Sequence, residues 1–124
     1  MLARYHIVRG ARPESDPLPE GIREDTRKHT RHVLRPPAPL VEAFLADVEA
    51  GFPEFRRGYE RTLEERYAAD PAPFEALAER AREGDVHLGC SCPTKHQPDV
   101  NRCHTVLALH FMKAKFSNLD VRLP

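Results

Sequence analysis

Val86-His87-Leu88-Gly89-Cys90 is the stretch that decides the fold, and Ser91-Cys92-Pro93 follows it directly. The first five residues form a short apolar run that is typical of a buried strand. The chain is then interrupted by proline, and a helical pattern resumes near Asn101 and continues to Phe111. This strand–loop–helix unit contains every cysteine of the chain: Cys90, Cys92 and Cys103. We therefore expect the other segments to build a core around it.

Periodic segments outside this unit predict the remaining elements. Residues 5–9 are β-branched and aromatic and indicate a strand. Three helices are expected to begin at Pro39, Pro53 and Pro71, because proline fits the first helical position. The order strand, helices, strand, helix predicts an α/β fold, with a small parallel sheet and helices packed around it. With 124 residues, one domain is expected over positions 1–124, and the Pro- and charge-rich region 11–37 is interpreted as a loop.

The last helix has two candidate capping residues, Asp99 and Asn101. If Asn101 is the N-cap, Cys103 and His104 occupy the first helical turn. Free backbone N–H groups and the helix dipole favour a negative charge there. The pattern therefore predicts a thiolate at the start of this helix.

Composition and charge narrow the class of protein. The chain holds 19 basic and 19 acidic side chains, so its overall charge gives no general attraction to nucleic acid or membranes. Residues 23–35 carry a net charge of +3, and so does the segment from residue 90 to the end, whereas residues 42–85 carry −6. No signal-peptide pattern and no membrane-spanning run are present, which predicts a cytoplasmic protein. An odd number of clustered cysteines favours metal or redox chemistry over a disulfide scaffold.

Two segments resemble a known family. Phe52-Pro53-Glu54-Phe55-Arg56-Arg57-Gly58-Tyr59-Glu60-Arg61-Thr62-Leu63 is similar to a helix of the YeaO-like proteins, domain-of-unknown-function family 488 (DUF488), and residues 77–88 resemble that family's passage from helix to strand. The chain lacks the family's Trp-Pro-Arg-Gly motif and has no tryptophan. Cys90-Ser91-Cys92 and Cys103-His104 are instead similar to the cysteine-bearing branches. The resemblance implies an α/β fold and no established reaction.

The cysteines and the neighbouring histidines predict a metal site. Cys90 and Cys92 point to the same side if both are extended, and the loop that follows is long enough to return Cys103 beside them. With His104 or His96 as the fourth ligand they form a Cys₃His set, which suits tetrahedral zinc. The ligands expected on this interpretation are Cys90, Cys92, Cys103 and His104, and the expected cofactor is zinc.

The same residues support other interpretations. Cys103 or Cys90 could act as a nucleophile, with His104 or His96 taking the proton, so these cysteines and His104 are also the candidate catalytic residues. Cys90 and Cys92 could cycle as a redox pair. All three cysteines could instead be ordinary core residues, since cysteine is among the most buried residue types. The sequence leaves open whether the protein is an enzyme.

Basic residues suggest two further partners. Arg9, Arg12 and Arg102, joined by Arg27 and Arg31, could bind a small anionic ligand such as a phosphate or a nucleotide near the cysteines. Each arginine taken singly is better explained as a solvated surface residue. The basic segment 23–35 could contact nucleic acid, although the neutral overall charge makes this the less favoured interpretation.

Overall fold

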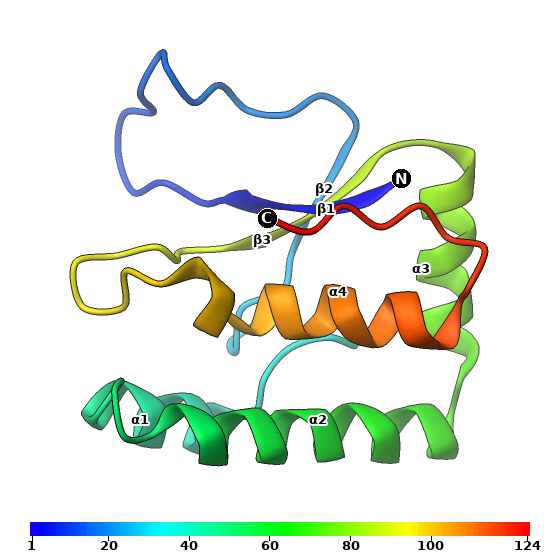
Figure 1. Ribbon diagram of the computed structural model, residues 1–124. Coiled ribbons are helices and arrows are strands. Elements are labelled where there is room, and N and C mark those ends of the chain that lie inside the picture. Colours follow the sequence, from blue (N-terminus) through cyan, green and yellow to red (C-terminus); the bar gives the residue numbers. More distant parts are fainter.

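A three-stranded parallel sheet organises the computed structural model, which describes residues 1–124 (Figure 1). The strands are β1 (Leu2–His6), β2 (Ile22–Asp25) and β3 (Val86–Cys90), in the order β1-β3-β2. The central strand pairs along its whole length with β1, and all five of its residues are buried. This agrees with its nearly continuous apolar sequence, because a central parallel strand has no solvent-facing side. The predicted α/β fold with a parallel sheet is confirmed.

The helices α1 (Ala38–Ala46), α2 (Phe52–Ala69) and α4 (His104–Lys115) lie on one side of the sheet, and α3 (Ala72–Glu83) stands beside it. Figure 1 shows α4 directly beneath the sheet, α1 and α2 in a further layer beneath α4, and α3 connecting the layers at one side. Loop 7–21 lies on the other side of the sheet. Eight of the twelve residues of α4 are buried because this helix is enclosed between the strands and α2.

The hydrophobic core fills the space between the sheet, α4 and the outer helices. Phe44 and Phe55 stack with their ring centroids 4.9 Å apart, which joins α1 to α2. Leu34 is completely buried ahead of α1, and its carbonyl accepts a hydrogen bond of 2.6 Å from the Tyr59 hydroxyl. None of the helices combines the length with the apolar run that a bilayer crossing requires.

Two regions differ from the sequence-based expectation, the first strand and region 11–37. The first strand begins at Leu2 rather than at residue 5. Region 11–37, expected to be a loop, contains β2, whose sequence Ile-Arg-Glu-Asp has a single apolar residue. Residues 119–123 contribute only one isolated bridge, in which Val121 pairs with Leu2.

The start of α4 is also displaced. The Asp99 carboxylate accepts from the backbone N–H of Asn101 and so caps a short 3₁₀ turn, η1 (Val100–Arg102), instead of α4. Cys103 is the N-cap of α4, and His104 is its first residue. Both residues therefore stand two positions earlier in the helix than a cap at Asn101 predicts.

Candidate functional site

The three cysteines come together at the carboxyl end of β3. Cys90 is the last residue of this strand, Cys92 lies in the loop that follows it in the chain, and Cys103 is the N-cap of α4. All three are free thiols, and their sulfur atoms lie within 4.8 Å of one another. Cys90 and Cys103 are buried, whereas Cys92 is partly exposed. The predicted convergence of the three sulfurs is thus present in the structure.

The contacts within the cluster favour one thiolate and two thiols. Hydrogen bonds from Cys90 and then from Cys92 hold the pKa of Cys103 well below that of an ordinary thiol, against the opposing effect of burial. The hydrogen bond to Cys103 raises the pKa of Cys92 to about 11, and the equivalent bond raises the pKa of Cys90. Of the three thiols, Cys103 is therefore the one that loses its proton most readily.

The guanidinium of Arg4 is linked to this sulfur through a neighbouring hydroxyl, and sequence analysis did not identify Arg4 as a site residue. The Thr105 hydroxyl donates to the Cys103 sulfur at 3.1 Å, and Nε of Arg4 donates to the Thr105 oxygen at 2.9 Å. A second nitrogen of Arg4 donates to the Cys92 carbonyl at 2.5 Å. No carboxylate pairs with Arg4, and its hydrogen bonds go to the Cys92 carbonyl and to Thr105, the residue that donates to the Cys103 sulfur. Arg4 and Thr105 are 101 positions apart, and no local sequence pattern links them.

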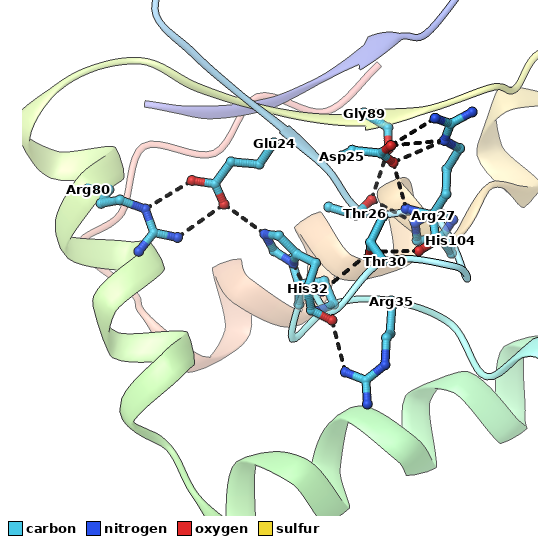
Figure 2. Close-up of polar contacts among 11 residues, drawn as sticks. Glu24, Asp25, Thr26, Arg27, Thr30, His32, Arg35, Arg80, Gly89 and His104 are labelled. Carbon is cyan, nitrogen blue, oxygen red and sulfur yellow. Dashed lines mark hydrogen bonds and ion pairs between the residues drawn. The ribbon is translucent and has the colours of Figure 1, made fainter.

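The tautomer of His104 is fixed by its neighbours (Figure 2). The Thr26 hydroxyl donates to the Gly89 carbonyl at 3.0 Å and lies 2.8 Å from Nε2 of His104. A hydroxyl has only one proton to donate, so Nε2 must be the donor to Thr26. The unprotonated Nδ1 of neutral His104 then faces the sulfur of Cys103 at 3.9 Å. His104 is thus placed to receive a proton from this sulfur.

A cavity of about 400 Å³ opens beside the sulfurs. All three cysteines line it, and so does His104. Its apolar wall is formed by residues of α1, of α2 and of the segment before α1: Pro36, Val41, Phe44, Leu45 and Phe55. Gln97 closes one side: it is 1% exposed, and its amide nitrogen lies 3.6 Å from the Cys92 sulfur. A ligand in this cavity would touch the sulfurs directly.

The two histidines expected as fourth ligand occupy different positions. His104 contacts Cys103 as described, but it is not part of the set of ligand atoms that lie within 4.8 Å of one another. Nε2 of His96 lies 2.6 Å from the Leu45 carbonyl, and the residue is exposed. The structure therefore brings three protein ligands together and leaves the fourth side of the cluster facing the cavity.

The arginines expected to bind an anion are dispersed. Arg9 is exposed in the loop after β1. Arg12 lines a separate hollow and donates to the backbone of His6 and Asp16. Of the three, only Arg102 lines the cavity beside the cysteines.

The basic segment 23–35 contributes Arg27, Lys28 and His29 to the rim of the same cavity. Both nitrogens of one edge of Arg27 bind the Asp25 carboxylate. Lys28 lies 3.6 Å from the carboxylate of Glu42. The positive charge of this segment is thus partly neutralised where it meets the cavity.

Comparison of the chain with models of protein families, with curated proteins and with solved structures finds no match, so the resemblance to the YeaO-like family remains a prediction.

Proposed function

We propose that the protein is a zinc-binding protein whose ion is held by Cys90, Cys92 and Cys103. The observation that carries this proposal is the convergence of three free sulfurs within 4.8 Å. Tetrahedral zinc with Zn–S bonds of about 2.3 Å spaces its sulfur ligands about 3.8 Å apart, so only small movements are needed to close the site. Thiolates are soft ligands that select zinc, Cu(I) or iron–sulfur clusters over magnesium and calcium.

The surroundings suit an ion with an open position. Structural zinc sites take four protein ligands, whereas catalytic sites take three and leave the fourth place to water or substrate. Here the three sulfurs border a cavity, and no fourth protein ligand lies among them. Arg4 and the N-terminus of α4 would offset the negative charge of three thiolates. We therefore infer an exchangeable site rather than a purely structural one.

The test is the metal content and coordination of the purified chain. After incubation with zinc and removal of the excess, we expect one zinc ion per chain, with three sulfur ligands and one lighter ligand by X-ray absorption spectroscopy. Cys103→Ser should lose the ion, because it removes the sulfur that the other two contact. A matched control, His110→Gln on the exposed side of α4, should retain it. Zinc that does not remain bound to the wild-type chain would refute the proposal.

A second candidate function is favoured by the position of His104. Its unprotonated Nδ1 faces Cys103, which is the arrangement in which a base removes the proton of a nucleophilic thiol. On this hypothesis metal-free protein at pH 7 reacts with iodoacetamide at Cys103 faster than at Cys92, although Cys92 is the more exposed. Labelling first at Cys92 would exclude it.

A further inference from the structure

The geometry points to a ligand class for the cavity: a small thiol with an apolar body, whose sulfur completes the coordination of the zinc ion. This inference rests on the proposed function, because the ion provides the attachment point. It follows from three features of the cavity: its apolar wall, the pairing of the arginines at its rim with carboxylates, and the chemistry of the cysteine cluster.

The wall of the cavity selects an apolar body. Phe44 and Phe55 form a stacked pair there, and both are at least 95% buried. Val41 and Leu45 extend this surface along α1. Cavities of about 300–1,000 Å³ with such linings hold small organic molecules, so about 400 Å³ admits a ring or a branched chain. A ligand without an apolar part would leave the accessible part of this lining, chiefly Val41 and Leu45, in contact with water.

The rim does not offer a free cation for an anionic head. Arg27 is held by the Asp25 carboxylate through two nitrogens. Arg102 donates to the Val48 carbonyl at 2.9 Å and lies 3.6 Å from the Asp99 carboxylate. A carboxylate already balances the charge of each of these arginines, so a phosphate or a carboxylate would gain less there than at an unpaired arginine. The rim therefore favours a ligand whose only charged atom is the one that binds the metal.

The cluster itself selects sulfur as that atom. Three thiolates make zinc a soft centre, and a fourth thiolate completes a coordination set that zinc commonly adopts in proteins. On binding, the thiol R–SH loses its proton to solvent, and its sulfur replaces the water at the fourth position, so no electrons are transferred. Arg4, which has no carboxylate partner and donates hydrogen bonds to both Thr105 and the Cys92 carbonyl, offsets part of the negative charge of the cluster.

The experiment uses the full chain loaded with Co²⁺ in place of zinc. The absorption spectrum of Co²⁺ depends on its ligands, whereas zinc has no such spectrum. Phenylmethanethiol is the probe. Benzyl alcohol has the same shape without sulfur, and 2-mercaptoethanol has sulfur without the ring. With phenylmethanethiol we expect the thiolate-to-cobalt band to grow by roughly one third, as a fourth sulfur joins three. We expect binding at least about ten-fold tighter than for either of the other two compounds.

A substitution that fills the cavity provides the second arm. Val41→Phe adds a ring where the ligand body should lie, so affinity for phenylmethanethiol should fall at least about ten-fold while the three-sulfur cobalt spectrum remains. Ala43→Phe adds the same ring to the exposed side of α1 and should change neither. If Val41→Phe does not fold by circular dichroism, Leu45→Trp is used instead, since Leu45 lines the cavity but is 37% exposed.

The outcomes separate the two levels of the hypothesis. A chain that does not retain Co²⁺ or zinc overturns the proposed function and the ligand class together. A chain that retains the metal through three sulfurs, yet binds 2-mercaptoethanol as tightly as phenylmethanethiol or shows no fourth sulfur, overturns the ligand class alone. Val41→Phe with undiminished affinity also overturns it.

Discussion

Thr26 is the residue that fixes the tautomer of His104 beside the cysteine cluster. It is completely buried, and its single hydroxyl proton is used by the Gly89 carbonyl, which forces His104 to present Nδ1 to the cluster. The buried hydroxyl thereby determines which form of the imidazole the sulfur of Cys103 meets. An apolar side chain of the same shape would leave the imidazole N–H without an acceptor in the interior.

We therefore expect Thr26→Val to lower the free energy of unfolding by about 1–3 kcal/mol, because it leaves the Nε2 proton of His104 buried and unpaired. Thr26→Ser, which keeps the hydroxyl, should recover most of this loss. The comparison is made by urea unfolding. Thr62→Val is the control, because the Thr62 hydroxyl only adds a bond to a helix carbonyl, and its loss should cost within about 0.5 kcal/mol. Equal losses at positions 26 and 62 would contradict this role of Thr26.

At the scale of elements, Glu24 ties the edge strand β2 to its neighbours (Figure 2). Its carboxylate binds two nitrogens of Arg80 on α3, at 2.9 and 3.0 Å, and lies 2.7 Å from Nε2 of His32. Although burial by itself raises the pKa of Glu24, the bonds from His32 and Arg80 outweigh it and lower this pKa to about 2. The ionised carboxylate is thus part of what holds β2 in place.

This predicts an acid-dependent contribution to stability. Because the folded pKa of Glu24 lies below its unfolded value of 4.5, the contribution is complete above pH 4.5 and is lost as the pH falls towards 2. Glu24→Gln should cost about 2–3 kcal/mol of unfolding free energy at pH 7, and the difference from wild type should shrink between pH 4.5 and 2. Denaturant unfolding at several pH values measures it. Glu79→Gln, in an exposed pair with Arg82, should show little effect. A difference in unfolding free energy between wild type and Glu24→Gln that did not change with pH would contradict this role of the Glu24 carboxylate.

The elements also show how far sequence reasoning extends. The central strand was predicted with its observed bounds because a fully buried parallel strand is an uninterrupted apolar run. Strand β2 was missed because it is a short edge strand with three charged residues, held by contacts such as that between Glu24 and Arg80. The meeting of the cysteines was predictable because it depends on one local strand–loop–helix. The supporting pairs Arg4–Thr105 and Thr26–His104 join segments 101 and 78 positions apart, and no periodic pattern encodes them.

For the whole molecule, the cluster connects the two layers that form the core. Cys90 ends the central strand, whereas Cys103 begins α4, which lies between the sheet and α2. An ion bound to both sulfurs crosslinks the strand layer to the helix layer. Such an ion is lost when the chain unfolds, since the unfolded chain does not hold the sulfurs together, and its binding energy therefore becomes stability of the fold.

We accordingly expect zinc to raise the unfolding temperature. At a free concentration about 1,000 times the dissociation constant, binding adds about 4 kcal/mol, which for a chain of this length corresponds to about 15 °C. Calorimetry with zinc and then with a chelator measures the shift. The variant with Cys90, Cys92 and Cys103 all replaced by serine is the control and should unfold at the same temperature in both conditions. If the unfolding temperature of the wild-type chain were also unchanged by zinc, the sulfurs would converge without binding a metal. The nucleophilic role of Cys103 would then be the better account of the site.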